Sequence, residues 1–413
     1  MLPSLSSLNL GNCELPTDTQ VSLAPPNPSR FMNLTSLISL NIRQNYFSST
    51  SELNLFLNLS TNLQVLSLDG NNFKGPLPFN ILEKFSFNEL EGSFPLCVGN
   101  LTSLQFLNLK LNKFGGKIPN ELGDLKDLCY LDLSFNSFNS SIPSSLGKLR
   151  KLEFLYLNGN QLYGTVPSTM GQLSELQELS ISGNSLTGEM SESHFMKLKC
   201  LKFFEFHGFV ELRVSPQWIP PFQLRFIDID SLNMGDQFPP WLQTQQNVSV
   251  LILRNASISS PIPEWFGTTF SSVTELDLSM NKINSVLPSS MKNLRILAVV
   301  DLSENKLTGS ITEWISQDLS QLRRLTLRSN NFSGVIPSSI KYFKYFYYLE
   351  LSENQFTGTK PEWIGEVSQL EELRLRSNSF YGPIPKQLCQ LPYLETLSLA
   401  DNNLTGRIPD CLL

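Results

Sequence analysis

The sequence predicts an α/β repeat solenoid, in which short parallel strands stack into one concave sheet and short helical or 3₁₀ turns return along the convex side. Three observations lead to this fold class. One sequence pattern recurs from end to end, its period is close to 24 residues, and the composition does not shift along the chain. An internal period of about 20 to 50 residues is typical of repeat architectures.

The clearest copy of the pattern is Leu101–Pro119, which reads LTSLQFLNLKLNKFGGKIP. Its template is L-x-x-L-x-x-L-x-L-x-x-N-x-L/F-x-G-x-I-P, the pattern of a leucine-rich repeat. The asparagine position of this template is the asparagine slot, and it recurs at intervals of 24 or 25 residues over most of the chain. The slot residues are Asn45, Asn71, Asn88, Asn112, Asn136, Asn160, Asn184, Asn281, Asn305, Asn330, Asn354, Asn378 and Asn402, with Cys13, Phe209, Leu232 and Ala256 in four further units. We therefore recognise seventeen units.

Each template position has a physical role. Alternation along a strand sends both leucines of L-x-L into the core and the middle residue outward. The slot asparagine can bond backbone groups of the neighbouring unit, and the glycine supplies a backbone conformation that other residues resist. The isoleucine-proline pair begins the next extended stretch, because proline fixes φ and biases the preceding residue toward β. Asn120–Lys126 is an example of the expected convex turn.

No unit can bury its own leucines alone, so we expect one continuous leucine-rich-repeat superhelix over residues 1–413. The isoleucine-proline pair of its template resembles that of plant-type repeats. Three segments depart from the pattern: a proline-rich loop insertion at 16–30, a shortened unit at 72–95 and irregular units at 194–241. Both ends read as repeats without polar caps, which predicts that the chain is a fragment of a longer protein or a gene-model error.

Composition excludes some functions. The formal net charge is −6, which argues against nucleic-acid binding, because that requires a basic surface. No stretch approaches the roughly 18 apolar residues that span a bilayer, so we expect no membrane-spanning segment in this chain. The first residues, MLPSLSSLNL, lack the charged leader of a signal peptide.

The sequence indicates a protein that is not an enzyme and needs no cofactor or metal. Nucleotide-binding, zinc-protease and serine-hydrolase motifs are absent, and the chain has only two histidines, His194 and His207. His207 falls on the concave face two residues after Glu205, where a solvated surface pair is the simpler interpretation. We expect no carboxylate to lie where burial could change its acidity.

Two segments carry a more specific resemblance. Val214–Leu253 reads VSPQWIPPFQLRFIDIDSLNMGDQFPPWLQTQQNVSVLIL, with ISSPIPEWF following at Ile258–Phe266, and Leu388–Leu412 reads LCQLPYLETLSLADNNLTGRIPDCL. They resemble the plant receptor-like proteins related to the tomato receptor for fungal ethylene-inducing xylanase. The resemblance implies a capped ectodomain on the extracellular side of the plasma membrane, one transmembrane helix, a short tail without a kinase, and a receptor kinase as partner.

We predict two ligand-binding surfaces on the concave face. The aromatic ladder consists of Phe106, Tyr130 and Phe154 in three successive units, with Tyr156 beside them. Such rings can anchor a protein or peptide ligand, or merely cover the flank of the sheet.

The second predicted surface, the arginine patch, comprises Arg324, Arg328, Arg374 and Arg376, with Glu350 and Glu372 between them. Cross-strand ion pairs would explain much of it, and the functional alternative is an acidic or carboxylate-bearing ligand.

Modification sites are suggested by eight N-x-S/T sequons, a number close to that expected by chance. They are Asn33, Asn58, Asn100, Asn139, Asn247, Asn255, Asn331 and Asn403. Cys389 and Cys411 lie on the return side of successive units, and we predict that they form a disulfide. Cys13, Cys97, Cys129 and Cys200 have no obvious pairing.

The leading hypothesis is a ligand-binding receptor ectodomain in plant defence. A secreted inhibitor of a microbial wall-degrading enzyme and a truncated, non-functional fragment are the alternatives. A downstream apolar helix in the full transcript would indicate a receptor, whereas a stop after a cap would indicate an inhibitor.

Overall fold

The computed structural model describes residues 104–311, 314–315, 319–359 and 362–412, with the short segments 5–10, 12–13, 39–41, 65–67, 74–75 and 89–94. The predicted insertion at 16–30 and the slots Asn45, Asn71 and Asn88 lie outside the described residues. The chain divides into two compact units, Met1–Val210 and Glu211–Leu413, and the boundary falls inside the segment predicted to be irregular. That one solenoid spans residues 1–413 remains a prediction.

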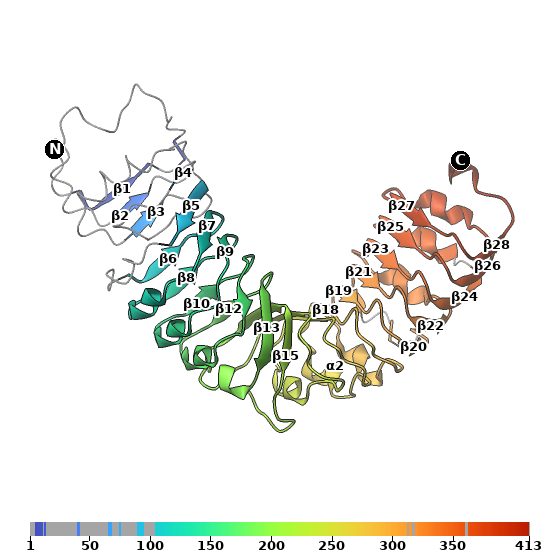
Figure 1. Cartoon of the computed structure of the whole chain (residues 1–413). Helices are drawn as coiled ribbons and strands as arrows, with labels where there is room; N and C mark the ends of the chain where they lie inside the picture. The colour runs from blue at the N-terminus through green and yellow to red at the C-terminus, as the bar shows by residue number, and fades with distance from the viewer. Residues whose placement is uncertain are drawn as a thin grey trace. The chain divides into compact units, whose positions relative to one another are not determined.

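The first unit has a main sheet of parallel strands, one from each repeat (Figure 1). The strands are β6 (Phe106–Asn108), β8 (Tyr130–Asp132), β10 (Phe154–Tyr156), β12 (Glu178–Ser180) and β14 (Phe203–His207). The first leucine of each L-x-L lies opposite its equivalent in the next strand, as in the pairing of Leu107 with Leu131 and of Leu131 with Leu155. A separate three-stranded parallel sheet precedes it, formed by β1 (Ser7–Asn9), β2 (Ser39–Asn41) and β3 (Val65–Ser67).

The second unit repeats this arrangement. Its main-sheet strands are β16 (Phe226–Asp230), β17 (Val250–Arg254), β18 (Glu275–Asp277), β19 (Val299–Asp301), β21 (Arg324–Thr326), β23 (Tyr348–Glu350), β25 (Glu372–Arg374) and β27 (Thr396–Ser398). All neighbouring strands are parallel and in register. The predicted sheet is confirmed in each unit.

Alternation along these strands separates core from surface. Leu131 and Leu133 are fully buried, whereas Tyr130 between Cys129 and Leu131 points to the other side of the sheet. The side of the main sheet opposite the leucine core is called the open face below. It carries the residue before the first leucine, the residue between the two leucines, and the residue after the second leucine of each L-x-L.

The slot asparagines join each repeat to the one before it. The side-chain N–H of Asn136 donates to the carbonyl oxygen of Leu109 in the preceding repeat, at 2.9 Å, and to that of Leu133 in its own. Its side-chain oxygen accepts a hydrogen bond from the backbone N–H of Phe114, at 3.0 Å. The same bonds recur at Asn160, Asn184, Asn305, Asn330, Asn354, Asn378 and Asn402. The predicted role of the slot is therefore confirmed.

A second set of short parallel strands follows the slots. In the first unit it comprises β4 (Lys74–Gly75), β5 (Glu89–Ser93), β7 (Lys113–Gly116) and β9 (Ser137–Phe138), and then β11 (Tyr163–Gly164), β13 (Ser185–Met190) and β15 (Phe209–Leu212), the last of which runs across the boundary. In the second unit it comprises β20 (Thr308–Gly309), β22 (Asn331–Gly334), β24 (Gln355–Thr359), β26 (Ser379–Pro383) and β28 (Asn403–Thr405). Gly116 has φ +73°, a left-handed conformation that confirms the predicted role of the template glycine.

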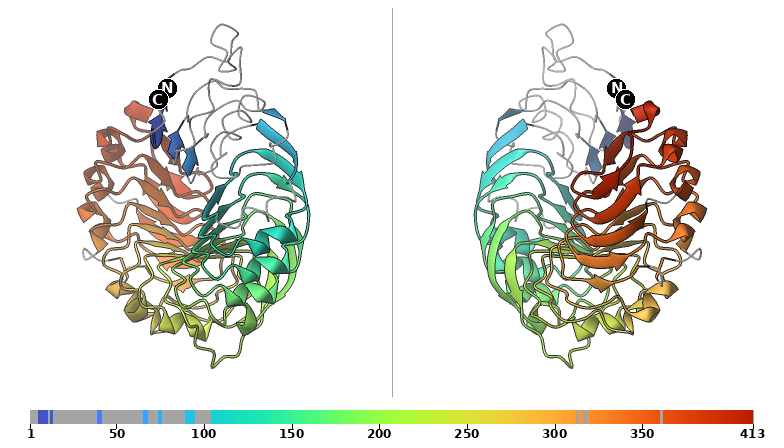
Figure 2. Two further views of the ribbon diagram at one scale, coloured as in Figure 1. Left: turned by 90° about the vertical axis from the view of Figure 1, so that its left-hand side faces the viewer. Right: turned by 90° about the vertical axis from the view of Figure 1, so that its right-hand side faces the viewer.

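Short turns return along the other side of each unit (Figure 2). Most are 3₁₀ helices that begin after the template proline: η3 (Asn120–Asp124), η4 (Ser144–Lys148), η5 (Ser168–Gln172), η7 (Pro240–Thr244), η8 (Ser289–Asn293), η10 (Ser338–Tyr342), η11 (Glu362–Glu366) and η12 (Lys386–Gln390). The three-residue η6 (Glu192–His194) and η13 (Asp410–Leu412) and the α-helical turn α2 (Phe266–Thr269) complete the described set. A Cβ added at Gly123 would lie 2.4 Å from the carbonyl oxygen of Ser145, so glycine is needed where adjacent turns stack closely.

The disulfide predicted from repeat spacing is present. Cys389 of η12 is bonded to Cys411 of η13, with Cα atoms 5.8 Å apart, inside the usual range for this bond. Among the described residues, no helix is both long enough and apolar enough to cross a membrane.

Candidate functional site

The aromatic ladder lies on the open face of the first unit, on β6, β8 and β10. The Phe106 and Tyr130 rings stack nearly parallel, with interplanar angle 6° and centroids 4.1 Å apart. Tyr130 also lies 5.8 Å from the centroids of both Phe154 and Tyr156, in tilted contacts. All four side chains are half-buried, so one part of each is covered by its neighbours and another part remains open to solvent. The rings therefore form one continuous apolar surface.

Carboxylates hold the two ladder tyrosines in place. The Tyr130 hydroxyl donates to Asp132 at 3.3 Å, and the Tyr156 hydroxyl donates to Glu178 on the next strand. Burial raises the pKa of Tyr130, with a further contribution from Asp132, and burial together with the bond to Glu178 raises the pKa of Tyr156. Both phenols therefore remain protonated hydrogen-bond donors at physiological pH.

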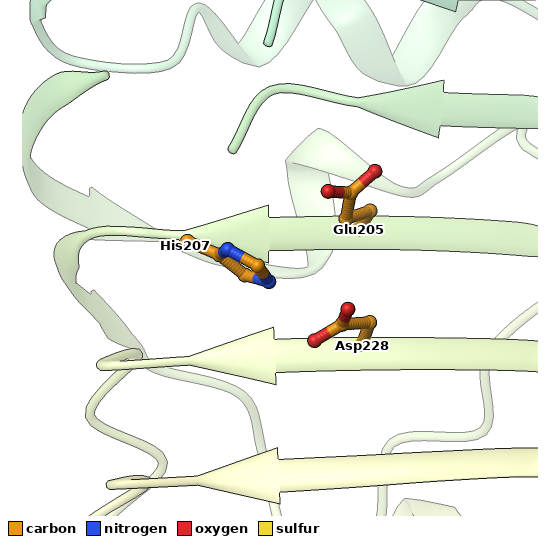
Figure 3. Close-up of side chains that lie close together, drawn as sticks. All are labelled: Glu205, His207 and Asp228. Carbon is orange, nitrogen blue, oxygen red and sulfur yellow. The ribbon is translucent and has the colours of Figure 1, made fainter. Parts of the chain in front are cut away.

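Serine hydroxyls bind the next carboxylate of this face. Glu205 on β14 accepts hydrogen bonds from Ser180 at 2.7 Å and from Ser182 at 2.6 Å. Figure 3 shows Glu205 and His207 on the same face of β14, and it also draws Asp228, which belongs to β16 of the second unit. Within the first unit this pair offers one carboxylate and one imidazole, fewer than the three protein ligands of a typical catalytic zinc site.

The arginine patch lies on the open face of the second unit, and most of it is ion-paired. Arg328 contacts Glu353 at 2.9 Å and Arg376 contacts Asp401 at 2.8 Å. Arg374 contacts Glu372 at 2.7 Å, with Glu350 farther away at 3.9 Å. These contacts support ion pairing as the main explanation of the patch.

Arg324 differs from the other three arginines. Its guanidinium carbon lies 4.3 Å from the ring centroid of Tyr348, and Arg374 approaches the same ring at 5.9 Å. Sequence reasoning did not single out Tyr348. Its position before the first leucine of its repeat, the same template position as Tyr130, is the signal that could have found it.

One expectation about carboxylates is wrong. Asp132, Asp277 and Glu350 are all buried although they lie on the open faces. Burial raises the pKa of a fourth residue in the same template position, Asp301, although hydrogen bonds from Ser303 oppose the shift. The sequence predicted the face of the sheet on which each side chain lies, but it did not predict how deeply the side chain is buried.

Five of the eight sequons fall on described residues. Asn139, Asn247, Asn255, Asn331 and Asn403 are all exposed. Asn33, Asn58 and Asn100 lie outside the described residues. Glycosylation of the exposed asparagines remains a prediction.

Comparison with known protein families agrees with this architecture. A leucine-rich-repeat-region model matches residues 80–285, and a leucine-rich-repeat model matches 271–332, 320–380 and 344–404. The chain belongs to the leucine-rich-repeat proteins. Parts of the chain are similar to plant receptor-like proteins.

Two of these relatives come from tomato, Solanum lycopersicum. The chain is 41% identical to Receptor-like protein EIX2 over 98 residues and 37% identical to Receptor-like protein EIX1 over 107 residues. Those matches cover 24% and 26% of this chain, respectively, and 10% of the length of each relative.

Solved structures share the fold over nearly the whole chain. The plant peptide hormone receptor RGFR1, solved in complex with RGF2, superposes with a TM-score of 0.78 and 28% sequence identity. This likeness covers 92% of the present chain and 61% of the RGFR1 chain.

Proposed function

We propose that this leucine-rich-repeat chain is the non-enzymatic, ligand-binding part of a plant cell-surface receptor-like protein. It recognises a protein or peptide, microbial or endogenous, in defence signalling. It acts on the extracellular side of the plasma membrane with a receptor kinase as partner. The tomato relatives support a receptor in preference to a secreted enzyme inhibitor, and the peptide-bound RGFR1 structure supports a peptide as ligand.

The observation that carries this proposal is the aromatic ladder. Four half-buried rings from three strands make a surface on which an extended peptide can lie without rearrangement of the sheet. Aromatic side chains are enriched among the residues that dominate binding energy at interfaces. The arginine patch is the second candidate surface, and it ranks lower because three of its arginines are already ion-paired.

The test is a displayed library of random twelve-residue peptides, selected against the secreted full chain. Selected peptides are then measured by calorimetry against Tyr130→Ala/Phe154→Ala. Loss of one interface anchor commonly costs about 2 kcal/mol, so we expect affinity to fall at least about thirtyfold. Tyr163→Ala is the matched control, because Tyr163 is exposed in the same unit but lies on β11, away from the open face.

Stability must be measured beside affinity, because the rings contact one another. Loss of aromatic stacking is expected to cost about 0.5–1.5 kcal/mol per pair. Tyr130→Phe keeps the ring and removes only the hydroxyl, so it should retain both stability and binding. Selected peptides that bind the double variant and the wild type equally would place the ligand surface elsewhere.

A further inference from the structure

Carboxylates lie beside the aromatic ladder, and no lysine or arginine in the part of the chain that the structure describes is ion-paired with them. Asp132, Glu178 and Glu205 lie on β8, β12 and β14, and their hydrogen bonds come from hydroxyls and a backbone N–H. The ion pairs described for the first unit instead join Asp124, Asp127 and Glu175 to lysines. Within the described residues, the three open-face carboxylates therefore have no Lys or Arg within ion-pairing distance.

Lys110 is the one lysine on the open-face positions of β6 to β14, and it does not neutralise the three carboxylates. The Lys110 nitrogen lies 5.6 Å from the ring centroid of Phe135, outside the ladder. The carboxylates approach the ladder closely: Asp132 accepts from Tyr130, and Glu178 accepts from Tyr156. The apolar ring surface thus lies in a negative local potential.

Rings and carboxylates in this arrangement favour the same kind of ligand group. The face of an aromatic ring attracts a cation through its quadrupole, and nearby carboxylates add charge attraction. A phenol that donates to a carboxylate also carries more electron density in its ring. The partial burial of the ladder strengthens both effects, because less water screens them. An acidic ligand group would be repelled from the same position.

We propose that the ladder and its carboxylates form a cation-binding subsite for a lysine or arginine side chain of the ligand. This inference rests on the proposed peptide-binding function and specifies its chemistry. The cationic group lies over the Tyr130 and Tyr156 rings, near Glu178, while the apolar stem of the same side chain packs along Phe154. Glu205 contributes through its charge from the adjacent strand.

The direct test uses two defined probes, capped penta-lysine and capped penta-glutamate peptides. Penta-lysine should bind the full chain, and its affinity should fall about tenfold in Glu178→Gln/Glu205→Gln. A similar fall is expected in Tyr130→Ala/Phe154→Ala. Gln retains an oxygen acceptor for the hydroxyl donors, so the fold should be preserved. Penta-glutamate should bind none of the proteins measurably.

A control variant separates the subsite from the general acidity of the chain. Asp124→Asn/Glu175→Gln removes two negative charges from exposed side chains of the same unit, away from the ladder. Penta-lysine should bind this control as tightly as it binds the wild type. Equal weakening in the control and in Glu178→Gln/Glu205→Gln would overturn the proposal, since it would show only a net-charge effect.

The peptide library separates this inference from the proposed function. If selected peptides depend on Tyr130 and Phe154 but contain no excess of lysine and arginine, the peptide-binding function stands and the cationic subsite is wrong. If selected peptides are indifferent to the ladder, the ladder-based function fails. Penta-lysine binding that is lost in both the Gln and the Ala double variants would still support the subsite in that case.

Discussion

The open faces of the two units use charge in different ways. In the second unit most charged side chains are neutralised locally, as at Arg254, whose guanidinium contacts Asp277 at 2.8 Å. In the first unit Asp132 occupies the same template position as Asp277, yet it is held by the hydroxyl and backbone N–H of Ser134. The second face thus neutralises Asp277 with an ion pair, whereas the first surrounds Asp132 with neutral hydrogen-bond donors. Carboxylates at the same template position can therefore have different partners.

The largest stability difference should appear between Asp277→Asn and Asp132→Asn. Both changes keep a side-chain oxygen for the backbone N–H two residues later, but only Asp277→Asn removes an ion pair. We expect Asp277→Asn to lower the free energy of unfolding by about 1 kcal/mol, discounted for the partial exposure of Arg254. Asp132→Asn should change it by less than about 0.5 kcal/mol. Chemical denaturation of both variants measures this, and equal losses would remove the distinction between the two faces.

A smaller effect, with a definite pH dependence, is expected for Asp301→Asn. Burial is the main cause that raises the folded-state pKa of Asp301, with the nearby Asp277 charge contributing. An acid with a raised folded-state pKa makes the ionised fold less stable above that pKa, and the penalty disappears as pH falls below the unfolded value. Asp301→Asn should therefore be more stable than the wild type near pH 7.

The advantage of Asp301→Asn should shrink as the solution is acidified. Asn can still accept from the backbone N–H of Ser303, so the comparison mainly isolates the charge. Thermal unfolding of both proteins from pH 7 down to about pH 4, near the unfolded value, provides the measurement. A difference that stays constant across this range would show that ionisation of Asp301 does not affect stability.

The smallest effect is expected at the exposed pair Arg328–Glu353. Hydrogen bonds from Ser329 and Arg328 lower the pKa of Glu353, with the Ser329 bond the largest cause. Both side chains are roughly half exposed, so water and salt screen their attraction. Arg328→Gln should reduce the free energy of unfolding by less than about 0.5 kcal/mol, and the loss should disappear in 1 M salt. A larger, salt-independent loss would indicate that Arg328 is a packing residue.

The repeat itself was predictable because its spacing encodes contacts. The L-x-L leucines, the bonds of Asn136 to the preceding repeat and the Cys389–Cys411 disulfide all follow from which positions coincide when 24-residue units stack. The ladder could be placed on the open face for the same reason, although its function stays a proposal. These predictions needed only periodicity and the direction of side chains.

The burial of the carboxylates and the partners in the ion pairs were not predictable in this way. No carboxylate was expected to lie where burial could change its acidity, but Asp132 is buried and burial raises the pKa of Asp301. The pairing of Arg328 with Glu353 depends on side-chain length and rotamer as well as on register. The left-handed conformation of the residue before most of the described slots, such as Phe135 at φ +53°, was also missed. Gly159 and Gly183 at the same position in the next two repeats were the available signal.

The hydrogen bonds that the described slot asparagines make between repeats all run from one repeat to the repeat before it, and this direction has consequences for biosynthesis. Asn136 reaches back to Leu109 and Phe114, Asn160 reaches back to Leu133 and Phe138, and each donor therefore emerges from the ribosome after the groups it binds. The carbonyl of Leu109 already accepts from Asn112 of its own repeat, but the backbone N–H of Phe114 gains its acceptor only when Asn136 is translated. Folding can then advance with translation, one repeat behind the newest residues. After insertion or loss of one whole period, every slot asparagine again lies beside equivalent backbone groups of the preceding repeat. Such chains can therefore lengthen or shorten in evolution by complete periods.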